Sequence, residues 1–356
     1  MSDYLLDNAF PIELMTMIFV ALPIKSLGRA RCVCKPWNKF LSSNSFMSMH
    51  AQTILQPMAM MALETANGDF EVHHLWSPSS TSMMDGGDAF IVQSMGSNTS
   101  LRRWLWWPHC GAALASSGGL ICYLVKEVSE AFLRVGNLAI GVYRTVPALR
   151  NMEHLLGFLF EPNTCLFKIM ALSKEGVFLF DSSRIAWKPI NPPASKDDYC
   201  YITEHITPWA PYVACARGKC YLNPVYDEKH IAFDMVNEEW ESILDLPTGV
   251  YGRIQAWEDR VYMINESLES EYVSIWVLED NRWVEKINID VRSISGWGFF
   301  PVIYHGDIVF LVDSPKVFVY NIKIAAMVDE INLEESFGSP HFFPYKLTLF
   351  HPPIFA

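Results

Sequence analysis

The stretch that decides the fold is GKCYLNPVYDEKHIAFDMVNEEWESI, residues 218–243. It opens with a glycine-bearing turn and contains three short runs rich in aromatic and apolar residues, GKCYLN, HIAFD and WESI. Short alternating runs that are separated by turn residues are typical of β-strands. This stretch therefore predicts consecutive strands of one small antiparallel sheet.

The same unit recurs along the chain, which is the sign of a repeat architecture. Two clear copies and two weaker ones have the same order of a turn, an inner strand rich in Tyr or Phe, an aromatic strand that ends in a polar residue, and often a Trp. The clear copies are DRVYMIN, SIWVLE and WVEKI (residues 259–287) and GDIVFLVD, KVFVYN and MVDEI (306–331); the weaker ones are GGLICYL, FLRVGN and YRTV (118–146) and VFLFD with WKPI (177–190).

The polar residue that ends the third strand of each unit provides a landmark. The landmarks recur at intervals of 42 to 53 residues, at Asn137, Asp181, Asp234, Glu279 and Asn321. Such intervals suit the four-stranded blades of a β-propeller. We expect each landmark to bond the turn that follows it, and the tryptophans at 187, 240 and 283 to fill the space between blades. These residues are predicted to be scaffold rather than chemistry.

Residues 51–356 are therefore predicted to form a mainly β domain, a β-propeller of about six blades. Residues 58–77 supply the first of six blades. A seventh blade within residues 78–117 or 191–215 is the alternative. HFFPYKLTLF (341–350) is the expected closing strand, because pairing the two chain ends removes exposed sheet edges. The repeats resemble kelch repeats in the degenerate form of plant F-box proteins, for which a Ser-Gly-Gly-Leu-Ile-Cys strand such as residues 117–122 is characteristic. The diglycine of regular kelch repeats is mostly missing.

The first 50 residues follow a different, helical pattern. Apolar residues between positions 12 and 22 recur at threes and fours, and proline marks the helix boundaries at Pro11, Pro23 and Pro36. Asn8, Ser26 and Asn44 are candidate caps. A bundle this small has a marginal core, so we expect part of its apolar surface to meet a partner or the following domain.

This region resembles an F-box. The family pattern is Leu-Pro, an apolar helix, Leu-Pro, a Leu, then Arg-x-Val-Cys-Lys-x-Trp. Residues 10–41, FPIELMTMIFVALPIKSLGRARCVCKPWNKFL, follow this pattern with Phe10 in place of the first Leu. The residues in register are Pro11, Ile12, Ile18, Leu22, Pro23, Leu27, Arg31, Val33, Cys34, Lys35 and Trp37.

The resemblance implies a small all-α module that docks to a Skp-type adaptor and, through it, to the cullin and RING subunits of a ubiquitin ligase. The chain would then be a noncatalytic substrate receptor whose propeller binds a target protein. Basic residues at positions 25, 29, 31, 35 and 39 would steer an acidic adaptor. The adaptor-binding residues that the resemblance implies are Pro11, Ile12, Ile18, Leu22, Pro23, Leu27, Arg31, Val33, Cys34 and Trp37, with Trp37 as an internal support.

Charge and hydropathy limit the other classes of partner. Residues 1–50 contain five Lys or Arg and three Asp or Glu, a net charge of +2. Since the whole chain has a net charge of −12, residues 51–356 carry −14. Residues 51–356 are acidic enough to repel a phosphate backbone. RRWLWWPH (102–109) is a single short stretch that combines basic and aromatic residues, as a nucleic-acid-binding surface does, so we expect no direct nucleic-acid binding. Neither a secretory signal nor a membrane span is expected, which predicts a soluble protein of the cytoplasm, the nucleus or both.

The motifs of common enzymes are missing, and no catalytic residue, cofactor or metal site is predicted. The sequence contains no HExxH, GxSxG, Walker or GxGxxG motif, and Cys215 with Cys220 lacks a second ligand pair at zinc spacing. Two alternatives to a ligase receptor stay open. A kelch-type scaffold that acts without a ligase would be distinguished by whether an adaptor co-purifies with the chain. A copper-radical oxidase on the same fold would be distinguished by the copper content of the purified protein. The candidate target-binding loops are residues 197–211 and 266–272, with Asp197, Tyr201, Trp209, Glu269 and Tyr272 as candidate contacts.

Overall fold

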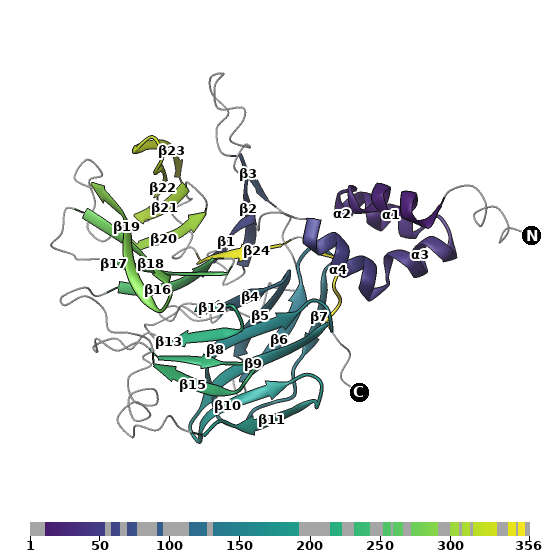
Figure 1. Cartoon of the computed structure of the whole chain (residues 1–356), viewed down its shortest axis with the longest axis horizontal. Coiled ribbons are helices and arrows are strands. Elements are labelled where there is room, and N and C mark those ends of the chain that lie inside the picture. The colour runs from purple at the N-terminus through teal and green to yellow at the C-terminus, as the bar shows by residue number, and fades with distance from the viewer. Residues whose placement is uncertain are drawn as a thin grey trace, which may run out of the picture.

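A computed structural model places four helices beside a large β-domain (Figure 1). It describes residues 11–53, 58–64, 70–76, 91–94, 114–126, 131–191, 214–222, 231–242, 252–257, 259–265, 272–290, 300–305, 308–313, 316–332, 341–346 and 348–352.

The first three helices begin at or next to the predicted boundary prolines. Helix α1 (Ile12–Val20) starts after Pro11 and α2 (Ile24–Arg31) directly after Pro23, two residues before the predicted cap at Ser26; α3 (Lys35–Leu41) holds Pro36 in its first turn. Helix α4 (Asn44–Thr53) is capped by Ser43, whose Oγ accepts a hydrogen bond from the Phe46 amide at 3.3 Å, rather than by Asn44. The predicted cap at Asn8 lies outside the described residues. None of the four described helices is both long enough and apolar enough to cross a lipid bilayer.

The described strands form six four-stranded antiparallel sheets, one for each predicted blade. From the innermost strand outward, the first blade is β24 (His341–Tyr345), β1 (Met58–Glu64), β2 (Phe70–Trp76) and β3 (Ile91–Ser94), and the second is β4 (Leu114–Ser117), β5 (Leu120–Lys126), β6 (Ala131–Asn137) and β7 (Val142–Thr145). The third blade is β8 (Met152–Glu161), β9 (Leu166–Ser173), β10 (Gly176–Asp181) and β11 (Ala186–Pro189), and the fourth is β12 (Ala214–Ala216), β13 (Lys219–Leu222), β14 (Ile231–Asp234) and β15 (Glu239–Ser242). The fifth blade is β16 (Gly252–Trp257), β17 (Arg260–Asn265), β18 (Tyr272–Glu279) and β19 (Arg282–Asp290), and the sixth is β20 (Phe300–His305), β21 (Ile308–Asp313), β22 (Lys316–Asn321) and β23 (Ala326–Asn332).

The sheets close into a ring, which confirms the predicted β-propeller. Neighbouring innermost strands contact one another in the cyclic order β24, β4, β8, β12, β16, β20 and back to β24. The ring is closed by the expected pairing of the two ends of the domain, since β24 pairs antiparallel with β1 and places Phe343 opposite Met60. The innermost strands face one another around the ring, so their unpaired edges are short and lie inside the circuit. The segments in which a seventh blade was open lie largely outside the described residues.

The landmark residues cap turns as predicted. The Oδ1 atoms of Asn137, Asp181, Asp234 and Asn321 accept hydrogen bonds from backbone amides two residues ahead at 2.8 to 2.9 Å. In each of these four turns the residue four positions after the landmark has a positive φ, between 50° and 66°. A short polar side chain followed by a left-handed residue thus specifies the turn between the third and fourth strands.

Glu279 is the exception, and its turn explains why. Strands β18 and β19 are joined by only two residues, Asp280 and Asn281, whose φ angles are 47° and 60°. Positive φ at both central residues marks a tight turn of type I′, which needs no side-chain cap. The longer Glu279 side chain instead forms an ion pair with Lys286, with 3.0 Å between Oε2 and Nζ.

The core lies between the blades. One apolar cluster joins Leu179 of the β8–β11 blade to Phe233 of the β12–β15 blade, and others link the next two pairs of blades. The indole nitrogen of Trp187 donates to the carbonyl oxygen of Pro147 in the preceding blade at 2.8 Å. The tryptophan therefore bridges adjacent blades, as the repeat pattern predicted.

Candidate functional site

Several apolar side chains of the described helical residues are exposed. Helix α1 packs inward through Met15 and Phe19, its opposite side carries the exposed residues Leu14, Met17 and Ile18, and Ile12 is exposed at its first position. Ile12 is 53% exposed and Ile18 is 51% exposed. Several exposed apolar side chains in one small domain mark a candidate interaction site. We call this the exposed helix surface; its members are Ile12, Leu14, Met17, Ile18 and Val33.

The inner side of the helices has a packed aromatic core. The ring of Trp37 meets that of Phe19 edge to face, with 4.8 Å between centroids, and Phe40 lies 5.1 Å from Phe46. His50 is buried beside them and its Nε2 lies 3.2 Å from the carbonyl oxygen of Leu22. This core fixes α1 against the other helices and thereby presents its outward side.

The structure separates the predicted adaptor-binding residues into three groups. Exposed members are Pro11, Ile12, Ile18, Pro23 and Val33, and half-buried members are Leu22, Arg31, Cys34 and Trp37. Leu27 has no exposed surface, so its prediction as an outward-facing contact is corrected: it supports the helices from within. Arg31 is held at the side by its Nε, which donates to Asn38 Oδ1 at 3.1 Å.

Two exposed residues, Leu14 and Met17, were missed from the sequence. Leu14 lies four residues before Ile18 and three before Met17, the spacing of one helix face. The signal was present in the sequence, but apolar residues on both sides of α1 hide which side is the inner one. Only the positions of the other helices decide it.

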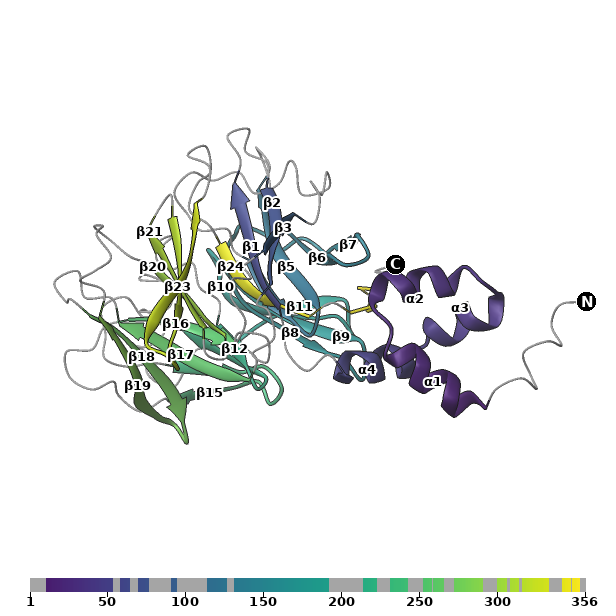
Figure 2. The same ribbon diagram turned by 90° about the horizontal axis from the view of Figure 1, so that it is seen from above.

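The helices pack directly onto the propeller. One apolar cluster contains Phe46 and Ala51 of α4 together with Phe160 of β8. The hydroxyl of Ser48 donates to the carbonyl oxygen of Pro162 at 2.9 Å, in the turn between β8 and β9. Figure 2 shows the helices at the edge of the β-domain, with α4 next to β8 and β9.

The turn of Pro162 belongs to one face of the ring. In each blade the turns between first and second strands and between third and fourth strands lie on the same face, because successive strands alternate in direction. We call this the turn face; residues 162–165, 182–185 and 235–238 lie on it. The opposite face, the loop face, is where β11 and β17 end and where β12 and β18 begin.

The candidate target-binding segments leave from the loop face. Residues 197–211 lie between β11 and β12, and residues 266–271 lie between β17 and β18. Tyr272, the first residue of β18, is 41% exposed. The other candidates, Asp197, Tyr201, Trp209 and Glu269, lie outside the described residues, as does RRWLWWPH. The helices thus dock on the turn face, and the strand ends that flank both candidate segments lie on the opposite one.

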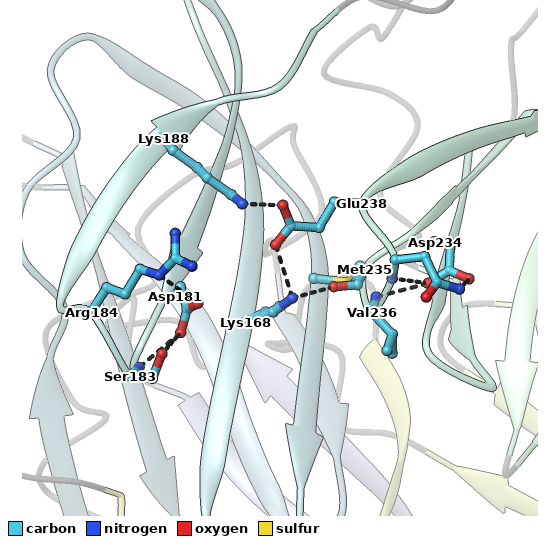
Figure 3. Close-up of polar contacts among 10 residues, drawn as sticks. Lys168, Asp181, Ser183, Arg184, Lys188, Asp234, Met235, Val236 and Glu238 are labelled. Atoms are coloured by element: carbon cyan, nitrogen blue, oxygen red, sulfur yellow. Dashed lines mark hydrogen bonds and ion pairs between the residues drawn. The ribbon is translucent and has the colours of Figure 1, made fainter.

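The strongest polar cluster joins two blades (Figure 3). Lys168 of β9 donates to the Met235 carbonyl at 2.7 Å and pairs with Glu238 at 3.1 Å, and Lys188 of β11 pairs with the other oxygen of Glu238. Burial acts to raise the pKa of Glu238, but the hydrogen bonds from Lys188 and Lys168 outweigh it and lower that pKa. Both lysines are paired with Glu238 within the cluster, so the cluster is a structural link.

Cysteines gather between the same two blades. Cys215 and Cys220 lie opposite each other on β12 and β13, and the Phe158 amide donates to Cys215 Sγ at 3.3 Å. Gly157 makes room for them, because a Cβ there would lie 2.8 Å from Cys220 Sγ. In the part of the chain that is described, no group of three or more His, Cys, Asp or Glu side chains is arranged to hold a metal ion.

Comparison with known proteins shows what the helices and the whole chain are similar to. Residues 8–50 match the F-box-like family model. F-box protein At5g49610 of Arabidopsis thaliana is 21% identical over 94% of each chain, and putative F-box protein At1g47790 of the same plant is 23% identical over 85% of this chain and 79% of that one. F-box/kelch-repeat protein At3g23880, also from Arabidopsis thaliana, is 28% identical over 24% of each chain.

The match covers α1 to α3 and most of α4, and the relatives extend over the propeller as well. The chain therefore carries an F-box-like domain followed by a β-propeller, and over most of its length it is similar to plant F-box proteins.

Proposed function

We propose that this protein is the substrate-recognition subunit of an SCF-type ubiquitin ligase. The observation that carries the proposal is the exposed helix surface, which lies within the F-box-like domain. Docking of a Skp-type adaptor there would link the chain to cullin and RING subunits. The ligase supplies the chemistry, and this chain itself is noncatalytic and needs no cofactor.

The physical argument starts from the cost of leaving apolar side chains in water. Removing apolar surface from water is worth about 25 cal/mol per Å², and Ile12 at the start of α1 and Ile18 are both about half exposed. The same domain carries three exposed basic residues on α2 and α3, Arg29, Lys35 and Lys39. The surface therefore suits a partner with an apolar groove and an acidic rim.

The loop face is the proposed site of target capture. It is opposite the face that carries the helices, so one partner does not block the other. Asp197, Tyr201, Trp209, Glu269 and Tyr272 are the proposed contacts, and the repeats are proposed to be of the kelch type. Holding the target near the ligase raises their effective local concentration, to the millimolar range for a short linkage. The ligase machinery is intracellular, so we propose that the protein works in the cytoplasm, the nucleus or both.

Assembly in solution tests the proposal. The purified chain is mixed with a Skp-type adaptor and a cullin, and the complexes are separated by size. We expect the chain to co-elute with cullin only when the adaptor is present. The variant Ile12→Asp/Ile18→Asp should elute alone, whereas Ile324→Asp, at a site 63% exposed on the β22–β23 turn, should assemble like the wild type. A chain that elutes alone in every mixture would support the ligase-free scaffold instead.

A further inference from the structure

Residues 348–352, which follow β24, cross the propeller beneath the helices. They leave the first blade and run over the turn that follows β6 in the second blade. The Nδ2 atom of Asn137 donates to the Thr348 carbonyl at 3.0 Å and to the Phe350 carbonyl at 2.9 Å. A contact with Thr348 Oγ1 at 3.3 Å completes the set. Asn137 is fully buried, so these bonds form away from water.

The choice of Asn at this landmark is informative. The turn needs only an acceptor, which the Oδ1 atom of Asn137 provides to the Ala139 amide at 2.8 Å. Asp181 and Asp234 cap equivalent turns with a carboxylate oxygen. An amide is required at position 137 because its second atom must donate to carbonyl groups of residues 348–352, which a carboxylate cannot do.

Two neighbouring residues are fitted to the same crossing. The hydroxyl of Tyr345, at the end of β24, donates to Asn137 Oδ1 at 2.8 Å. Gly119 has φ +90°, and a Cβ there would lie 2.3 Å from Thr348 Oγ1 and 2.7 Å from the Lys346 carbonyl. The second blade is thus shaped to admit the backbone of this segment at close range.

The segment then enters the junction between helices and propeller. Leu349 and Phe350 are buried in the same cluster as Leu27 of α2 and Phe46 of α4. The ring of Phe350 meets that of Phe160 edge to face at 4.9 Å. Burial first, and then the positive charges of Arg31 on α2 and Arg144 on β7, lower the pKa of His351. Residues 348–351 therefore lie between groups of both domains.

We propose that Asn137 is a positioning residue: it anchors residues 348–352 as a wedge that fixes the orientation of the F-box-like domain on the propeller. The wedge continues from the strand that closes the ring, so closure of the propeller and placement of the helices depend on one another. If the proposed function holds, on which this consequence rests, the wedge sets the distance between the ligase and the captured target. The orientation itself is a property of the chain and does not depend on that function.

A distance measurement on the full chain tests the wedge. Spin labels are attached through unnatural amino acids at Lys39 of α3 and Lys174 of the β9–β10 turn, both exposed, so that the eight native cysteines stay unlabelled. We expect one narrow distance distribution for the wild type. Asn137→Asp keeps the turn cap but loses the donors, and should lose the single narrow peak. Asn321→Asp, which caps the β22–β23 turn in the same way, should keep it.

The outcomes are decisive in each direction. A wild-type distribution in Asn137→Asp, or equal broadening in Asn321→Asp, overturns the wedge. If Asn137→Asp does not fold, Phe350→Ala removes the wedge without changing the second blade and should broaden the distribution in a chain that retains its β signal; a narrow peak there also overturns the proposal. Adaptor affinity of Asn137→Asp should equal that of the wild type, because the exposed helix surface is unchanged. Failure of the wild type to bind adaptor would count against the proposed function and leave the distance result standing.

Discussion

The indole nitrogen of Trp240 donates a hydrogen bond to the carbonyl oxygen of Asn191, 2.7 Å away, and so ties the outer strand of one blade to the end of the preceding blade. Trp187 makes the equivalent bond to Pro147 one blade earlier. Each indole also packs on a buried Phe of its own blade; for Trp240 this is Phe233, at 5.0 Å. The repeated tryptophan therefore joins blades by apolar packing and by one polar bond.

Replacing Trp240 separates these two contributions. Trp240→Ala should lower the free energy of unfolding by about 3 kcal/mol, because a large ring and its hydrogen bond are both lost. Trp240→Phe keeps a ring against Phe233 and should lose only about 1 kcal/mol, the contribution of the bond. Chemical denaturation of both variants gives the comparison. Equal losses would show that packing on Phe233 contributes little.

The left-handed turn residues predict opposite effects of glycine at two equivalent positions. Ile185 has φ 54°, a strained conformation for a β-branched residue, so Ile185→Gly should stabilise the protein by about 1 kcal/mol. Gly141 has φ 66° and open space where a Cβ would lie, so Gly141→Ala should destabilise it by a similar amount through the backbone alone. Thermal melts check both signs, and a lower melting temperature for Ile185→Gly would contradict the account of these turns.

The helices should lose stability in mild acid. Burial, outweighing a backbone hydrogen bond to Leu22, lowers the pKa of His50 below its ordinary value of 6.5. The unfolded chain therefore binds a proton that the folded chain resists, so stability falls as the pH decreases through 6.5, by at most about 1.4 kcal/mol per pH unit for this group. His50→Gln removes this group, and its stability profile between pH 7 and 5 should be flatter than that of the wild type. Parallel profiles would show that His50 does not titrate on unfolding.

Removing residues 1–53 should destabilise the propeller as well as abolish adaptor binding. The reason is the shared cluster: without the helices, Phe160 and Phe350 lose their cover. The melting temperature of the truncated chain should therefore fall below that of the full chain. An unchanged melting temperature would show that the propeller is independent of the helices.

Most of the fold could be predicted from the sequence, because the patterns that specify the strands and turns are local and repeated. Landmarks such as Asp181 and Asp234 specify a turn within four residues, and a Trp follows each of these two landmarks six residues later, so strand order could be predicted without coordinates. Glu279 departs from the pattern, and a different turn type at residues 280–281 accounts for it. The closing strand was likewise predictable, because a ring must pair its ends.

The parts that depend on packing between distant segments could not be predicted. Leu27 fits the family pattern as well as Ile18 does, yet one is buried and the other exposed, because α2 turns its apolar side toward a core shared with the propeller. The change in charge and periodicity near residue 50 marks a change of secondary structure, but the apolar core continues across it. The bonds from Asn137 to residues 348–350 span more than 200 residues and leave no local signal.

The central claim is that α1 presents an adaptor-docking surface, and a titration of a Skp-type adaptor into the purified full chain tests it most directly. The wild type should bind, and Ile12→Asp/Ile18→Asp should weaken the affinity by at least about 100-fold, because burying a carboxylate in an apolar interface costs several kcal/mol. The variant should melt at the wild-type temperature, since both side chains are about half exposed in the free chain. Absence of binding by the folded wild type, or equal affinity in the folded variant, would contradict the account.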